Sequence, residues 1–197
     1  MQVYFTPLDA PISISVQHNV DDAVRNKGLV TEGRKKHFHI QEFSKHGSIN
    51  YLAVKTFDQN ITIACASMLK VERNYSRRSM PHRTFEIRVN KGETICFTKY
   101  FSLHSSWHLN SNIVRSRAIK TCVKESRHSF GQLLKSNTQA WNRKWNIADI
   151  MVRGPGAIDR ALRFNIYHML IVGNDDGGLS SIGAKTLSGE GYRGHVF

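Results

Sequence analysis

The sequence contains few cysteines and no long apolar segment. Its three cysteines, Cys65, Cys96 and Cys122, are an odd number without a C-x-x-C pair or a zinc-ligand spacing. Such a set argues against a disulfide framework and predicts reduced thiols in a cytoplasmic protein. No run of about 18 apolar residues occurs, and the segment that begins at Met1 lacks a basic region followed by an apolar one. We therefore predict neither a membrane span nor a secretory signal.

Acidic residues are also scarce. The chain has 28 Lys and Arg against 15 Asp and Glu, which gives a formal net charge of +13, with ten histidines in addition. The imbalance is large between Thr94 and Ala148, where nine Lys and Arg accompany one acid, Glu125. An excess of this size is typical of proteins that bind nucleic acid, and it also occurs on solvated faces that bind nothing. The charge alone leaves both interpretations open.

Motifs for nucleotide binding and serine hydrolysis are missing. Neither a G-x-x-x-x-G-K-[ST] phosphate loop nor a G-x-S-x-G elbow occurs. Residues 189–194 fit G-x-G-x-x-G, but no convincing strand precedes them and only three residues follow, too few for the helix of a dinucleotide-binding unit. His37 and His39 share one face of a predicted strand, but no third ligand follows at a recognisable spacing. We predict no metal site.

Alternating apolar residues predict strands over about residues 10–105. The clearest of them are expected at 12–16, 49–56 and 61–65. Segments 84–89 and 94–101 flank the turn sequence Asn-Lys-Gly-Glu of residues 90–93, so they are predicted to pair as an antiparallel hairpin. This half of the chain is expected to form a β-sandwich or part of one.

The periodicity changes near residue 110. Apolar residues then recur at helical spacing, which predicts helices near 113–127, 130–146 and 157–172. Trp141 and Trp145 lie four residues apart on one face of the second helix. Two tryptophans on the apolar side of an amphipathic helix favour a core position over a stacking platform for nucleic-acid bases.

Three segments near the end of the printed sequence resemble a known family. They are Ala-Leu-Arg-Phe-Asn-Ile-Tyr-His at 161–168, Ser-Ile-Gly-Ala-Lys at 181–185 and Gly-Glu-Gly-Tyr-Arg-Gly-His-Val-Phe at 189–197. Together they closely resemble the opening of the catalytic domain in glycoside hydrolase family 65, which contains maltose, trehalose, kojibiose and nigerose phosphorylases. The helices before Asp149 resemble the family's linker, and the strands resemble the second part of its N-terminal β-sandwich.

The resemblance implies an α+β chain, in which antiparallel strands of a β-sandwich precede linker helices and the first helix of an (α/α)6 barrel. The implied domains are a partial sandwich at 1–108, a helical linker at 109–148 and the truncated start of the barrel at 149–197. The implied reaction is inverting phosphorolysis of an α-glucosidic disaccharide, which gives β-glucose 1-phosphate and a free sugar. Inorganic phosphate acts as the nucleophile, so no cofactor is expected.

The resemblance also assigns the glycine-rich segment 180–197 to the approach of a sugar pocket. Tyr192 and His195 are expected to line the pocket, with Arg193 and Glu190 as supports, or all four only shape the turn into the next barrel element. In the family the motif continues into a Trp-Asp-Thr-Glu segment that contacts the sugar, and the catalytic acid and the phosphate ligands lie farther on. We therefore expect an internal piece of a disaccharide phosphorylase that has no catalytic residue and is inactive alone.

The expected partners of the whole protein are an α-linked glucose disaccharide, phosphate and a second identical subunit, with neither a membrane nor nucleic acid among them. Two functions of other classes stay open: a basic nucleic-acid-binding module and a non-catalytic carbohydrate-binding or interaction fragment. On the third predicted helix, buried hydrogen bonds to neighbouring helices are favoured over substrate contact for Arg163 and Asn165.

Overall fold

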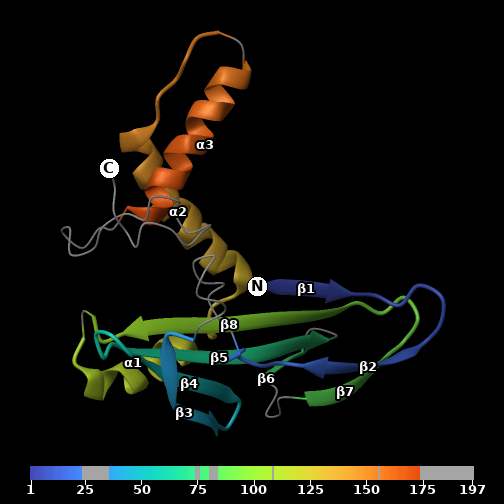
Figure 1. Cartoon of the computed structure of the whole chain (residues 1–197). Helices are drawn as coiled ribbons and strands as arrows, with labels where there is room; N and C mark the ends of the chain where they lie inside the picture. Colours follow the sequence, from blue (N-terminus) through green and yellow to red (C-terminus); the bar gives the residue numbers. More distant parts are fainter. Residues whose placement is uncertain (24–35, 74–75, 80–83, 108, 155, 174–197) are drawn as a thin grey trace. The chain divides into compact units, whose positions relative to one another are not determined.

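The computed structural model describes residues 1–23, 36–73, 76–79, 84–107, 109–154 and 156–173. These residues form eight strands and three helices (Figure 1). Contacts between residues divide the chain into two compact units, of which the first holds the strands and the first helix, and the second holds the last helix and most of the helix before it. Among the described residues, no helix is long and apolar enough to cross a membrane.

An antiparallel sheet of six strands forms the body of the first unit. Its main path follows the order β1 (Gln2–Phe5), β8 (Ile95–Ser105), β5 (Thr62–Arg73), β4 (Ile49–Thr56) and β3 (Phe38–His46), and β6 (Ser76–Ser79) pairs with the end of β5. Strand β4 is buried continuously from Ile49 to Val54. Strand β3 has an irregular register between Ile40 and Glu42, where one residue is inserted as in a β-bulge.

Two further strands, β2 (Ile12–Gln17) and β7 (Thr84–Val89), pair with each other as a separate antiparallel ribbon. The ribbon packs on the large sheet through a cluster in which Val71, Val89 and Ile95 are buried. Val71 and Ile95 are odd-numbered positions of β5 and β8, and alternate residues of a strand point to opposite faces. The ribbon therefore covers the sheet face that carries these odd-numbered side chains.

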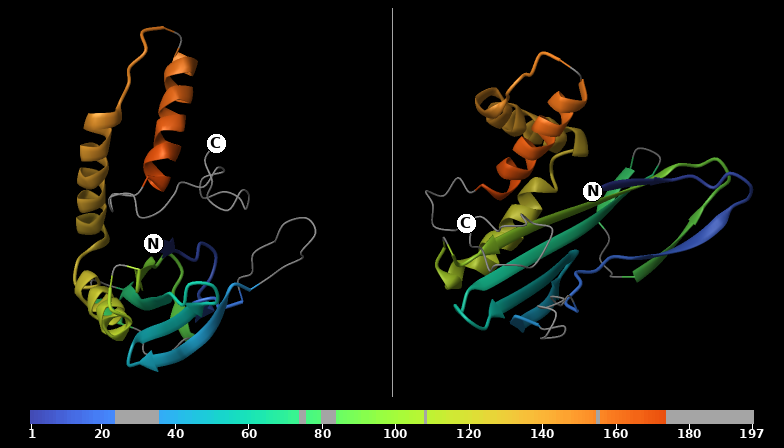
Figure 2. Two further views of the ribbon diagram at one scale, coloured as in Figure 1. Left: turned by 60° about the vertical axis from the view of Figure 1, so that its left-hand side comes forward. Right: turned by 45° about the horizontal axis from the view of Figure 1, so that its top comes forward.

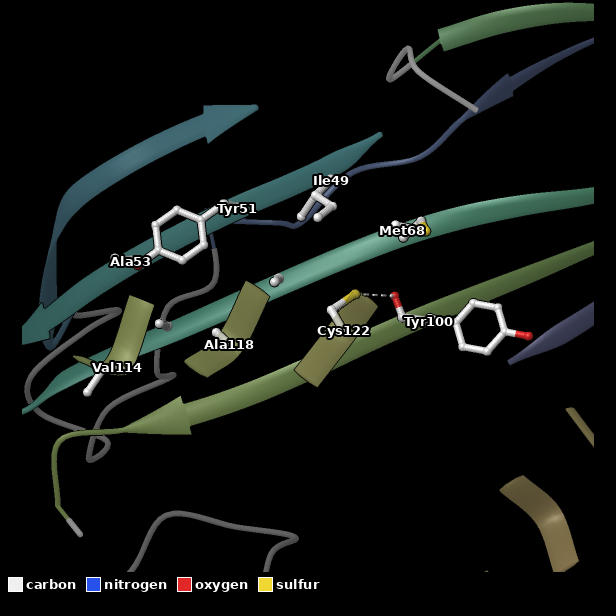
Figure 3. Packing of buried hydrophobic residues seen from close by; sticks show 10 residues of the cluster. Ile49, Tyr51, Ala53, Met68, Tyr100, Val114, Ala118 and Cys122 are labelled. Atoms are coloured by element: carbon white, nitrogen blue, oxygen red, sulfur yellow. Dashed lines mark hydrogen bonds between the residues drawn. The ribbon is translucent and has the colours of Figure 1, made fainter. Parts of the chain in front are cut away.

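Helix α1 (Ser111–Glu125) covers the opposite face of the sheet (Figure 3). It packs on even-numbered positions of β5, including Ala64 and Ala66, through Val114, Ala118 and Cys122. The small side chains of the alanines allow the helix to lie close to the strands, since protein interiors leave few voids. The first unit is thus built of three layers: the helix, the large sheet and the two-stranded ribbon.

Polar contacts fix the ends of α1. Asn110 is its N-cap and accepts a hydrogen bond from the Asn112 backbone N–H at its side-chain oxygen, at 2.9 Å. Near the other end, the Tyr100 hydroxyl donates to the His128 carbonyl at 2.9 Å, and the Lys70 ammonium donates to the Ser126 carbonyl. These contacts join the sheet to the chain that leaves the helix.

The predicted hairpin between residues 84–89 and 94–101 is wrong, although both strands exist. Strand β7 pairs with β2, and β8 pairs with β1 and β5. The turn between them is present, with a hydrogen bond from Glu93 N to Asn90 O of 3.1 Å, but it carries the chain from the ribbon to the large sheet. Two strands joined by a short turn can pair as a hairpin in one sheet or lie in two sheets that pack face to face. Both arrangements bury alternate side chains, so the apolar pattern does not identify the strand with which each one pairs.

The second unit contains two helices that lie side by side (Figure 2), α2 (Phe130–Ala148) and α3 (Gly156–Val172). Helix α2 starts with a capping box, in which Ser129 N donates to Gln132 Oε1 at 2.8 Å and Gln132 N donates to Ser129 Oγ at 3.2 Å. All three predicted helices are confirmed within a few residues. The expected (α/α)6 barrel and the expected domain boundaries at 108 and 148 stay predictions.

Candidate functional site

The residues that the sequence singled out for sugar binding, Glu190, Tyr192, Arg193 and His195, lie outside the described residues. The structure therefore gives no position for them. The segment that resembles the catalytic domain begins before them, however, and its first helix, α3, is described. A candidate site is the cavity between this helix and the end of α2.

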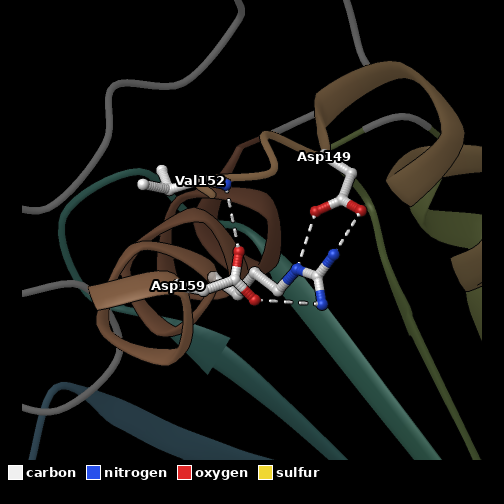
Figure 4. A network of polar contacts seen from close by, with 4 residues as sticks. Asp149, Val152 and Asp159 are labelled. Carbon is white, nitrogen blue, oxygen red and sulfur yellow. Dashed lines mark hydrogen bonds and ion pairs between the residues drawn. The ribbon is translucent and has the colours of Figure 1, made fainter. Parts of the chain in front are cut away.

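An arginine on α3 holds the chain that connects the two helices. Arg163 Nε and Nη2 donate to the two carboxylate oxygens of Asp149 at 3.0 and 2.9 Å, and Nη1 lies 3.4 Å from Asp159 (Figure 4). Asp159 also accepts a hydrogen bond from Val152 N at 3.3 Å. The hydrogen bond to Asp149 and the charges of both carboxylates raise the pKa of the Arg163 guanidinium above its ordinary value. The network ties the start of α3 to the end of α2.

Aromatic side chains complete the contact between the helices. The rings of Trp141 on α2 and Tyr167 on α3 have centroids 5.4 Å apart. Within α3, Phe164 meets His168 edge to face at 4.4 Å. Trp141 and Trp145 are half-buried. The expected core position is found for neither tryptophan, since α2 contains no buried residue, although Trp141 packs against Tyr167.

The cavity at this contact has a volume of about 560 Å³. Trp145, Phe164 and Tyr167 supply aromatic surface to it, and Arg160 lines it together with the Arg163 network. A cavity of this size and mixed lining suits a small ligand with an apolar face.

The side chains of the cavity do not form an acid–base pair for glycosidic chemistry. Asp149 and Asp159 are the carboxyl groups that line it, and both already bind Arg163. An inverting glycosidase needs one carboxyl group that is free to protonate the leaving oxygen. Within the described part of the chain there is also no group of three or more His, Cys, Asp or Glu side chains that could hold a metal ion. Among the described residues, the lining of this cavity therefore offers no free carboxyl group.

The expectation of buried hydrogen bonds to neighbouring helices is wrong for Arg163, because its side chain is 42% exposed and its hydrogen-bond partner lies in the connection that follows α2. Its main partner, Asp149, was not foreseen. The i,i+4 spacing of Asp159 and Arg163 on one helix could have indicated the weaker contact. No local signal marks the stronger one, because Asp149 lies in the connection before α3.

Comparison with known proteins shows similarity to disaccharide phosphorylases. The chain is 26% identical to a kojibiose phosphorylase of Thermoanaerobacter brockii over 212 residues, which cover 100% of this chain and 27% of that protein. It is 28% identical to an alpha,alpha-trehalose phosphorylase of the same organism over 162 residues, or 78% of this chain and 21% of that protein. A solved structure described as a putative kojibiose phosphorylase from human microbiome superposes with a TM-score of 0.69 at 22% identity, over 100% of this chain and 26% of that one.

The chain thus spans about a quarter of the length of the curated relatives it matches. The structural likeness shows that the fold is shared. The sequence model of the glycosyl hydrolase family 65 N-terminal domain matches residues 1–144, most of the chain. The chain belongs to glycosyl hydrolase family 65.

Proposed function

We propose that the whole protein of which this chain forms part is an inverting disaccharide phosphorylase. It would convert an α-linked glucose disaccharide and inorganic phosphate into β-glucose 1-phosphate and a free sugar. The observation that carries the proposal is the family match over residues 1–144, together with relatives named as kojibiose and trehalose phosphorylases. No cofactor takes part in this reaction.

The chain itself would contribute binding and support rather than the chemical step. The described residues of the α2–α3 cavity provide no free carboxylic acid, since Arg163 engages both carboxylates. In an inverting reaction the acid protonates the leaving oxygen while the nucleophile attacks the opposite face of the sugar. We place the acid and the phosphate ligands in parts of the whole protein beyond these 197 residues, and we assign Tyr192 and His195 to the wall of the sugar pocket, supported by Arg193 and Glu190.

The first test measures turnover by the 197-residue chain alone. The chain is incubated with phosphate and, separately, with kojibiose, trehalose, nigerose and maltose, and β-glucose 1-phosphate is quantified. We expect no product above the rate without protein. Steady formation of β-glucose 1-phosphate by the isolated chain would contradict the assignment of the acid to another part of the protein.

The second test asks whether the segment works in a complete phosphorylase. This chain replaces the matching region of the kojibiose phosphorylase of Thermoanaerobacter brockii, and the chimera is assayed with the same four disaccharides. We expect turnover of at least one of them, and a loss of kcat/KM of about tenfold or more for Tyr192→Phe, because a hydroxyl that binds the substrate is removed. Tyr4→Phe, which removes an exposed hydroxyl of β1, is the matched control and should leave kcat/KM unchanged.

A folded chimera that is inactive towards all four sugars would contradict the proposed function. Equal activities of the Tyr192→Phe and unsubstituted chimeras would contradict only the assignment of Tyr192. We also propose that the whole protein is a homodimer, which sedimentation of the chimera can check.

A further inference from the structure

A different cavity lies in the first unit, beside the N-terminal end of α1. Its volume is about 410 Å³, and its lining comes from β3, β4, the turn into β5 and the first turns of the helix. Tyr51 and Ala53 of β4, which are nearly buried, line it on the sheet side. Ala53, which has a short side chain, is also part of the buried cluster that packs on the helix.

The charges in this cavity are mixed. Arg115 of α1 binds Glu42 of β3 at 2.9 Å and lies over the ring of Tyr51, 5.4 Å from its centroid. Lys55 adds a second cation. The Glu42 carboxylate opposes binding of an anion, whereas Arg115 and Lys55 oppose binding of a cation. A neutral ligand with many polar groups avoids both penalties.

The uncharged lining residues can both donate and accept hydrogen bonds. Gln41, Asn60 and Asn112 supply side-chain amides, and Thr62 and Ser111 supply hydroxyls. Thr62 already donates to Gln41 at 3.3 Å, which leaves both amide hydrogens of Gln41 for another acceptor. A phosphate ion can use only the donors of this set. The hydroxyl groups of a sugar, which donate and accept at once, can use all of it.

Tyr51 is part of the cavity wall on the sheet side. The residue is 1% exposed and lines the cavity. Within the described part of the chain no hydrogen bond is made by its hydroxyl, and the side chain contacts the guanidinium of Arg115 through its ring. Burial and, next, the nearby Glu42 raise the pKa of this phenol, so the hydroxyl keeps its proton. The hydroxyl is not among the fully buried polar atoms that lack a partner, so solvent reaches it, and it can donate to and accept from a bound molecule.

We propose that the cavity formed by β3, β4 and the first turns of α1 binds one neutral sugar unit through its hydroxyl groups. The site is carried by residues 41–115 and is additional to the sugar pocket proposed for residues 190–195. The proposed binding is independent of the phosphorylase activity, because the ligand class is inferred from the mixed charges and the amide groups of the cavity.

The test is a titration of the 197-residue chain with glucose in phosphate-free buffer. Binding is measured from the chemical-shift changes of the backbone amide NMR signals. At ordinary ligand efficiency a ligand of this size has a Kd of about 2 mM. We expect the signals of Asn60 and Asn112 to shift, and Tyr51→Phe to weaken binding about fivefold because one hydrogen bond is lost. Tyr100→Phe is the matched control, since its buried hydroxyl bonds to His128 elsewhere on the same sheet face, and it should leave the Kd unchanged.

Three results would overturn the proposal. The signals of Asn60 and Asn112 could stay unshifted at twenty times the expected Kd, or Tyr51→Phe could bind glucose as well as the unsubstituted chain. Alternatively, inorganic phosphate could shift the same signals while glucose fails to displace it, which would make the cavity an anion site. The proposed phosphorylase activity is measured by product formation in the chimera, so either proposal can fail while the other holds.

Discussion

Val89, Ile95 and Val114 of the sheet unit are completely buried, whereas neither α2 nor α3 contains a single buried residue. The first unit is stabilised by apolar surface removed from water, which contributes about 25 cal/mol per Å². The helix pair depends on ring contacts and ion pairs, of which the exposed ones contribute about 0–1 kcal/mol each. The comparison teaches that the cavity on the sheet has buried residues, Tyr51 and Ala53, in its wall, while the cavity between the helices rests on a few separate contacts.

The largest expected difference is between two isoleucine substitutions, one in each unit, and it is a difference in the free energy of unfolding. Ile95→Ala removes a completely buried side chain and should lower the free energy of unfolding by about 2–5 kcal/mol. Ile147→Ala, at a side chain that is 90% exposed, should change it by less than about 0.5 kcal/mol. Urea unfolding followed by circular dichroism measures both. Equal effects would mean that burial does not distinguish the units.

A second prediction concerns alkaline pH and acts on the sheet unit alone. Burial, and then Cys65, raises the pKa of the Cys122 thiol from 9.0 to about 11. The folded state therefore holds this proton more tightly than the unfolded state, so its stabilising contribution is complete below about pH 9 and is lost as the pH rises towards 11. The free energy of unfolding should fall by about 2 kcal/mol over this range for this reason.

The control for that measurement is Cys122→Ala. This variant retains every other group that titrates at alkaline pH, so the difference between the two pH profiles isolates the thiol. Urea unfolding at several pH values between about 8 and 11 provides the profiles. Parallel profiles would show that Cys122 has the same pKa in the folded and unfolded states.

A smaller effect is expected at the capping box of α2, in the helix pair. Ser129→Ala removes the hydroxyl that accepts from Gln132 N and should destabilise the first turn of α2 by about 1 kcal/mol. Ser136→Ala, at an exposed position inside the same helix, should be neutral or slightly stabilising because alanine is the better helix former. Hydrogen exchange of the α2 amides measures the two changes. A loss of protection in Ser136→Ala equal to that in Ser129→Ala would contradict the role of the cap.

The smallest expected effect lies in the Arg163 network. Arg163→Lys keeps the charge but loses the bidentate contact with Asp149, and the partial exposure of both side chains limits the cost to about 0.5 kcal/mol. Amides of α3 should exchange about twofold faster, and those of the sheet should not change. Arg160→Lys, on the same helix and lining the same cavity, is the control. Faster exchange throughout β5 in Arg163→Lys would mean that the two units are energetically coupled.

Local patterns in the sequence predicted most elements, but only part of their pairing. The alternation at 12–16 and 84–89 identified both strands, because one face of each packs on the sheet. It did not show that they pair with each other, since the residues between β2 and β7 contain four other paired strands. Pairing of this kind depends on contacts distant in sequence, which a periodic pattern does not encode.

The cavities were less predictable than the elements. Glu42, Tyr51 and Arg115 belong to two strands and a helix that meet only in the folded unit. None of the three stands in a motif, and Tyr51 reads as an ordinary core residue of β4. The glycine-rich segment 180–197 was recognised because a family motif has a fixed sequence, whereas a cavity between packed layers has no sequence signature.

The pairing of β1 with β8 and of β2 with β7 also sets an order of events during translation. Strands β3, β4 and β5 are consecutive in both sequence and sheet, so they can associate as soon as they leave the ribosome. Synthesis at about 5–20 residues per second takes about 3 to 13 s to proceed from Gln17 to Thr84. During that time Ile12, Ile14 and Val16 have no strand partner among the described residues, and a nascent chain with an unpaired apolar strand is a substrate for chaperones. Strands β1 and β2 are therefore synthesised first, but each can pair only after its partner, β8 or β7, has been synthesised.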